Sequence, residues 1–77
     1  MDQKALDHLF TYHAPTPDQL VAYEKLRGDA RSFARAINEL VPDGPDKSAA
    51  VRLLRECLMT ANAAIACHVP REEVLHV

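Results

Sequence analysis

Apolar residues recur along two long stretches of this 77-residue chain at alternating steps of three and four residues. In the stretch from about 17 to 41 the repeating positions are Tyr23, Leu26, Ala30, Phe33, Ile37 and Leu40. In the stretch from about 45 to 69 they are Val51, Leu54, Leu58, Ala61, Ile65 and His68. This spacing places each set on one side of an α-helix, so the pattern predicts a helix over each stretch.

The residues at the ends of these stretches are typical of helix boundaries. Thr16 can cap the first helix, Pro17 suits the first helical position, and Gln19 completes a Thr-x-x-Gln capping box. The breaker-rich sequence at 42–45 separates the two helices, and Pro70 disfavours helical geometry at the residue before it. Two helices of similar length joined by a short turn predict an antiparallel hairpin.

A shorter helical pattern covers about residues 2–9, where the apolar residues share one side. A helix this short is marginal alone, so we expect it to pack on another part of the fold. A proline-braced linker follows at 10–15. The sequence therefore predicts an all-α single domain over 1–77, with a short N-terminal helix and an antiparallel two-helix hairpin. Residues 71–77 fit either a short tail or a last helical turn.

The last helix carries a second face of small or moderately apolar residues: Leu53, Cys57, Thr60, Ala64 and Cys67. One face is enough to contact the partner helix of a hairpin, so a second one predicts contact with another subunit. A single core of this size rarely supplies more than about 3–5 kcal/mol of stability, which favours the same solution. We therefore expect a compact homo-oligomer.

The two cysteines and the absence of export signals predict a cytosolic protein. Cys57 and Cys67 stand roughly 15 Å apart along one helix, too far for a disulfide, and we expect buried free thiols in a reducing compartment. The sequence has no run of about 18 apolar residues and no signal-peptide pattern. Neither a membrane span nor secretion is therefore expected.

The charge pattern favours a local anion site over a general nucleic-acid surface. The formal net charge is −2, which argues against binding to DNA or RNA polymers. Arg27, Arg31 and Arg35 nevertheless recur at steps of four, with Lys25 beside them. Acidic residues nearby can make this a solvated, salt-bridged face. The alternative is a phosphate-binding ridge, because arginine forks suit phosphate oxygens.

Two short segments carry side chains that an ordinary core does not require. In the linker, Phe10 is expected to point inward as an anchor. The Tyr12 ring either folds onto the hairpin, which spacing alone favours, or offers a stacking platform for a purine base. In the last helix, Thr60 and Asn62 stand among alanines. They fit either an inter-subunit hydrogen bond or a ligand contact.

The four histidines give no metal signature. His8 and His13 straddle a helix end. His68 and His76 straddle a proline. Neither pair has the one-turn spacing of a helical metal site, and no cysteine pair completes a tetrahedron. Because a glycine-rich loop and a Ser/His/Asp grouping are also missing, we expect no metal, no cofactor and no enzymatic activity.

Three strings in register resemble one family: Phe10-Thr11-Tyr12-His13-x-Pro15, Tyr23-Glu24-x-Leu26-Arg27 and Met59-Thr60-Ala61-Asn62-Ala63-Ala64-Ile65-Ala66. It is the phage-encoded anti-CBASS cyclic-nucleotide sponge, which shares a helical hairpin domain with a Thoeris anti-defence sponge. The likeness spans about residues 8 to 67. It implies a compact homohexamer in the cytoplasm of an infected bacterium. Such a protein is not an enzyme: it binds cyclic dinucleotide messengers and holds them away from immune effectors.

The resemblance also implies the residues of a dinucleotide pocket between two protomers. In the family, a tyrosine from each protomer stacks on a base, and a basic residue from each pairs with phosphate. The first role falls on Tyr12. The second falls on Arg27, with Lys25 as the alternative. Three further residues of the linker are expected to line the same pocket: Phe10, Thr11 and His13.

Some members of the family bind cyclic trinucleotides in a separate pocket, which here would use Thr60, Asn62 and His68. Many relatives have an arginine after the alanine-rich run, where this chain has Cys67-His68. Imidazole is largely neutral near pH 7, so His68 can replace that charge only in part. The alternative function from another class is a small helical protein-interaction module without a nucleotide ligand.

Overall fold

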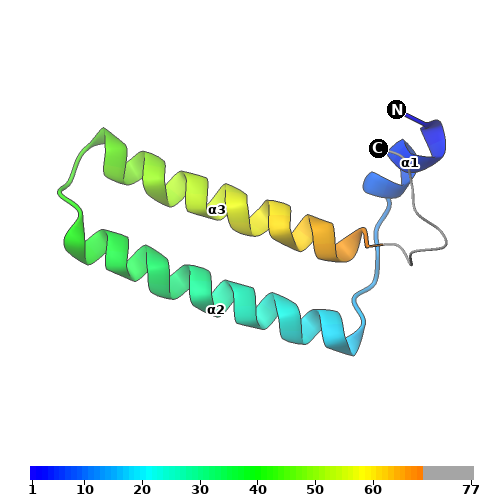
Figure 1. Cartoon of the computed structure of the whole chain (residues 1–77), viewed down its shortest axis with the longest axis horizontal. Coiled ribbons are helices and arrows are strands. Elements are labelled where there is room, and N and C mark those ends of the chain that lie inside the picture. The colour runs from blue at the N-terminus through cyan, green and yellow to red at the C-terminus, as the bar shows by residue number, and fades with distance from the viewer. Residues whose placement is uncertain (69–77) are drawn as a thin grey trace.

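The computed structural model describes residues 1–68, over which the chain forms three helices and no strand. They are α1 (Gln3–Leu9), α2 (Pro17–Leu40) and α3 (Pro45–Ala66). In Figure 1, α2 and α3 run side by side in opposite directions from a tight turn, whereas α1 lies at the open end of this hairpin, beyond the end of α3. The predicted all-α fold of a short N-terminal helix and a two-helix hairpin is confirmed.

The last helix ends earlier than predicted. α3 ends at Ala66 rather than at residue 69. Here the Cys67 N–H bonds to the Ala63 carbonyl at 2.9 Å, and the His68 N–H bonds to the Ile65 carbonyl at 3.3 Å. Two carbonyls at this end, those of Ile65 and Cys67, also accept hydrogen bonds from side chains outside α3. These bonds satisfy carbonyl groups that would accept hydrogen bonds from backbone N–H groups if the helix were longer. Residues 71–77 and His76 lie outside the described residues.

The start of α2 matches the sequence prediction. The Thr16 hydroxyl accepts a hydrogen bond from the Gln19 backbone N–H at 3.2 Å, and the Gln19 side-chain oxygen accepts one from the Thr16 N–H at 3.0 Å. Pro17 occupies the first turn. The Gln19 amide also donates to the Ile65 carbonyl at 3.0 Å. The capping box therefore fixes the start of α2 and ties it to the end of α3.

The tight end of the hairpin is closed by Lys47. Its ammonium group donates to the Asn38 carbonyl, in the last turn of α2, and to the Asp43 carboxylate, both at 2.9 Å. A cation suits this negative end of the helix dipole. The Lys47 hydrogen bond, together with its charge, lowers the pKa of the Asp43 carboxyl group. Gly44 caps α3 with φ 154° and ψ −178°, a conformation that favours glycine.

The single chain buries little apolar surface. Among the described residues, the buried hydrophobic side chains are Ala5 and Ile37. The α2 seam is half-buried up to residue 30, but Phe33 and Leu40 are 59% and 80% exposed, so their predicted burial is wrong for the single chain. A straight helix drifts by about 20° per heptad from a 3.5-residue repeat. Because one helix alone covers α2, positions that drift off the seam meet solvent.

The two faces of α3 behave largely as predicted. Its seam positions Val51, Leu54, Leu58, Ala61 and Ile65 are half-buried against α2, whereas His68 is exposed. On the second face, Leu53, Cys57, Thr60 and Ala64 are exposed and Cys67 is half-buried. Both thiols are free, but the expectation of a buried Cys57 is wrong for the single chain, because no part of residues 1–68 covers this face. A free apolar face is what an oligomer would require.

The shape agrees with this thin core. The Cα radius of gyration is 15.9 Å, against about 11.5 Å for a compact chain of this length. No helix in the described part of the chain is long and apolar enough to cross a membrane.

Candidate functional site

The linker between α1 and α2 presents two aromatic rings to solvent. Phe10 and Tyr12 are 85% and 84% exposed. Phe10 is the C-cap of α1: its N–H bonds to the Asp7 carbonyl, and the Thr11 N–H bonds to the His8 carbonyl. The chain leaves the helix at this point, away from the hairpin seam, so the predicted inward orientation of Phe10 is wrong for the single chain. The Tyr12 ring likewise does not fold onto the hairpin.

The neighbours of Tyr12 hold the linker against α1. The Thr11 hydroxyl donates to the Asp7 carbonyl at 2.7 Å, and His13 Nε2 donates to the His8 carbonyl at 2.8 Å. Both bonds satisfy carbonyls in the last turn of α1. Tyr12 therefore projects from a backbone that is fixed on both sides. The residues expected to line a pocket with it act, in the single chain, as its supports.

The two candidate phosphate-binding residues have different surroundings. Lys25 lies 3.1 Å from Asp29 in an exposed ion pair on α2. Arg27 stands two residues further on, which turns it by about 200° around the helix. It lines a groove between α2 and α3. The Lys25 ammonium is already partly neutralised, so Arg27 is the better placed of the two for an anionic ligand.

The groove combines an apolar floor with three guanidinium groups and has a volume of about 380 Å³. Arg27 and Arg31 come from α2 and Arg55 comes from α3, around the residues Ala30, Ala34, Val51, Leu54 and Leu58. Among residues 1–68 the ion pairs are those of Lys25 and Lys47, and none includes an arginine. The predicted salt-bridged face is therefore not formed by the arginines. An apolar floor below uncompensated guanidinium groups suits a flat anion.

Sequence reasoning missed Arg55. Its signal was its spacing: it lies four residues after Val51 and three before Leu58, both on the α3 seam. A residue with that spacing flanks the seam and must border the groove to α2. Tyr12 is not among the residues that line this groove. One chain thus does not join the ring and the arginines in one pocket.

The candidate trinucleotide residues are also spread over α3 and its end. Thr60 is exposed, and Asn62 lies about 200° away around the helix. The Asn62 side-chain oxygen is buried and has no hydrogen-bond partner among the described residues. An unsatisfied buried acceptor is costly, so a donor from elsewhere would stabilise it. His68 borders a separate shallow groove with Gln19, Ala64 and Ile65.

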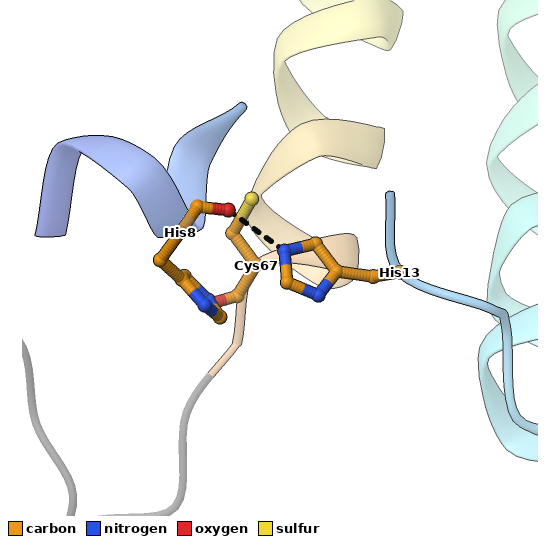
Figure 2. Close-up of side chains that lie close together, drawn as sticks. All are labelled: His8, His13 and Cys67. Carbon is orange, nitrogen blue, oxygen red and sulfur yellow. Dashed lines mark hydrogen bonds between the residues drawn. The ribbon is translucent and has the colours of Figure 1, made fainter. Parts of the chain in front are cut away.

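A further cluster joins residues that are far apart in the sequence (Figure 2). One ring nitrogen each of His8 and His13 and the Sγ of Cys67 lie within 4.8 Å of one another, and all three side chains are half-buried. His8 Nε2 donates to the Cys67 carbonyl at 2.9 Å. The sequence prediction of no metal rested on the spacing between each histidine and its neighbours along the chain. Cys67 stands 59 positions from His8, so local spacing could not reveal it.

Comparison with known proteins gave one family. Residues 1–66 match the family model described as the hairpin domain of Acb2/Tad1. Searches of curated proteins and of solved structures gave no match.

Proposed function

The chain belongs to the Acb2/Tad1 hairpin-domain family, and we propose that it binds cyclic dinucleotide immune messengers and sequesters them without degrading them. The family is one of binding domains and is consistent with cyclic-nucleotide sequestration. By this activity a phage would evade CBASS-type immunity in the cytoplasm of its bacterial host. The family match supports binding as the class of function, and the geometry of the described residues supports a cyclic dinucleotide as the ligand.

The observation that carries the proposal is the exposed Tyr12 ring on its braced linker. Neither a buried core nor the hairpin contact uses this ring, which is 84% exposed. Stacking of a base on an aromatic side chain contributes about 1–3 kcal/mol. The bonds of Thr11 and His13 to α1 keep the Tyr12 backbone in place before a ligand arrives. A preorganised ring loses less entropy on binding.

A second chain would supply the second Tyr12 ring and the second Arg27 group that a two-fold symmetric ligand requires. A cyclic dinucleotide has two bases and two phosphates related by approximate two-fold symmetry. A two-fold interface repeats the same side chains on both halves, so two Tyr12 rings and two Arg27 groups match the ligand. The exposed apolar residues of α2 and α3, such as Phe33, Leu53 and Met59, support assembly. We propose a homo-oligomer, with the hexamer that the resemblance implies.

A trinucleotide pocket is a weaker part of the same proposal. The unpartnered Asn62 oxygen supports a contact with a donor from another subunit or from a ligand. Thr60 and His68 would have to meet it across an interface, because they do not meet in one chain. None of these three residues supplies a permanent positive charge, so we expect trinucleotides to bind more weakly than dinucleotides.

A thermal-shift panel of cyclic di- and trinucleotides tests the function, since a ligand that binds the native state alone raises its unfolding midpoint. We expect cyclic dinucleotides to raise the midpoint and linear dinucleotides to raise it less. Chromatography of the ligand after denaturation of the protein should recover it intact, whereas linear product would indicate a phosphodiesterase.

The alternative is a protein-interaction module. Its supporting observation is the apolar surface at Phe33, Leu53 and Met59, which could receive a helix of another protein. This alternative predicts a monomer or dimer, measured by light scattering, and no shift with any cyclic nucleotide. The same panel therefore separates the two functions.

A further inference from the structure

The open end of the hairpin gathers three side chains that are good ligands for a transition metal. Two imidazole nitrogens and a thiol sulfur, from α1, the linker and the end of α3, lie within 4.8 Å of one another at His8, His13 and Cys67. Figure 2 shows the three side chains close together, with the His13 ring turned toward the His8 carbonyl and the Cys67 sulfur. The two rings stand 4.4 Å apart and are inclined by 52°, so they are not stacked face to face.

The hydrogen bonds of the two histidines leave each neutral ring with a free lone pair. A carbonyl oxygen can only accept, so Nε2 of His8 and Nε2 of His13 must carry the hydrogen in their bonds to the Cys67 and His8 carbonyls. Nδ1 of each neutral ring then holds the lone pair. Histidines that bind metals usually donate the other ring N–H to such an acceptor, which orients the ring.

The position of the cluster gives a metal a structural task. α1 has only seven residues, and its one fully buried side chain is Ala5. In the described part of the chain, side-chain hydrogen bonds of His8 and His13 connect α1 to the end of α3 and to the linker. Small domains with thin cores are commonly stabilised by a disulfide or a structural metal. Here both thiols are free, so Cys67 is available as a metal ligand.

We propose that His8, His13 and Cys67 bind one Zn²⁺ per chain, with water as the fourth ligand. Imidazole and thiolate favour zinc and similar metals over Mg²⁺ and Ca²⁺. On binding, Cys67 releases its thiol proton to solvent, two nitrogen lone pairs and the thiolate form bonds to the metal, and no electron is transferred. Tetrahedral zinc requires ligand separations of about 3.3–3.6 Å, so the three side chains, whose atoms lie within 4.8 Å of one another, must turn and move closer on binding.

Cobalt substitution of the full chain, kept reduced without chelators, tests this site directly. Co²⁺ bound by a thiolate in a tetrahedral site gives a near-ultraviolet charge-transfer band and strong visible bands. We expect both at one equivalent of Co²⁺, and their loss when one equivalent of Zn²⁺ is added. Cys67→Ser should lose the charge-transfer band, whereas Cys57→Ser, the matched control with the exposed thiol of α3, should keep it.

A second variant keeps the proposal testable if Cys67→Ser does not fold. His8→Gln retains an amide that can donate to the Cys67 carbonyl but lacks the ring ligand, so metal affinity should fall at least about tenfold while circular dichroism is unchanged. Zn²⁺ should raise the thermal midpoint of the wild type and of Cys57→Ser only. No charge-transfer band in the wild type, or an equal one in Cys67→Ser, would overturn the proposal. Neither result depends on cyclic-nucleotide binding, which is measured separately.

Discussion

The two ends of the hairpin are held by different kinds of contact. At the tight end, Lys47 bonds to Asn38 and Asp43, nine and four positions away, and one glycine makes the turn. At the open end, Gln19 reaches Ile65 across 46 positions and His8 reaches Cys67 across 59. At the tight end, contacts between residues that are close in the sequence stabilise the chain reversal. The open end depends on tertiary placement, and the exposed Phe10 and Tyr12 rings lie beside it.

This contrast suggests that the two ends contribute differently to stability and to ligand binding. The turn fixes the register of α2 against α3 and needs no partner. The open end positions α1 and the linker, whose Phe10 and Tyr12 rings have no use in the single chain. Changes in the linker at the open end should therefore alter ligand binding, whereas changes at the tight end should alter stability alone.

The largest expected effect is on ligand binding at the open end. Tyr12→Ala should weaken cyclic dinucleotide binding by at least about 30-fold, because a symmetric site loses two rings worth about 1–3 kcal/mol each. The ring is exposed, so the thermal midpoint of the free protein should not change. Isothermal titration measures the affinity. Tyr12→Phe keeps the stacking surface and should bind within about threefold of the wild type; equal losses in both variants would argue against stacking.

A smaller loss of affinity is expected in the groove. Arg27→Ala should weaken cyclic dinucleotide binding by about tenfold. The two symmetry-related hydrogen bonds to phosphate contribute about 1.5–3 kcal/mol each, but Arg31 and Arg55 retain most of the positive field. Fluorescence titration with a labelled ligand at two salt concentrations is a suitable measurement. Arg35→Ala, which lies outside the groove lining, is the control. A larger loss in Lys25→Ala would move the phosphate contact to that residue.

At the tight end the expected effect is on folding. Gly44→Ala should lower the free energy of unfolding by about 1–3 kcal/mol, because φ 154° is strained for a residue with a Cβ. No neighbouring atom lies within 4 Å of that added Cβ, so the cost is in the backbone. Urea unfolding measures it. Gly28→Ala, a mid-helix glycine with equally open surroundings, should instead stabilise by about 0.5–1 kcal/mol. Similar values for both would contradict the assigned turn geometry.

The cross-link from α2 to α3 gives the smallest effect. Gln19→Ala removes the capping-box acceptor and the donor to Ile65, and it should destabilise by about 1–2 kcal/mol in urea unfolding. Gln19→Glu keeps an acceptor for the cap and loses the donor alone. Its stability should lie between those of the wild type and Gln19→Ala. Hydrogen exchange at the last turn of α3 should accelerate in both variants.

The same contrast explains what the sequence could predict. The turn at 42–45 and the Thr16–Gln19 cap are formed by residues that are close together in the sequence, so a local sequence pattern predicts them. The exposure of Phe33 depends on how far α2 drifts from its partner, and Arg55 enters the groove from the opposite helix. The cluster that includes Cys67 forms only when the chain ends meet. Periodicity shows which face of each helix is apolar. It does not show which faces of distant segments contact each other.

Isothermal titration of a cyclic dinucleotide into the assembled protein, with light scattering of the same sample, tests the central claim most directly. We expect a homo-oligomer that binds one ligand for every two chains and releases it intact on denaturation. A monomeric hairpin that produces no binding heat, or a stoichiometry of one ligand per chain, would contradict it.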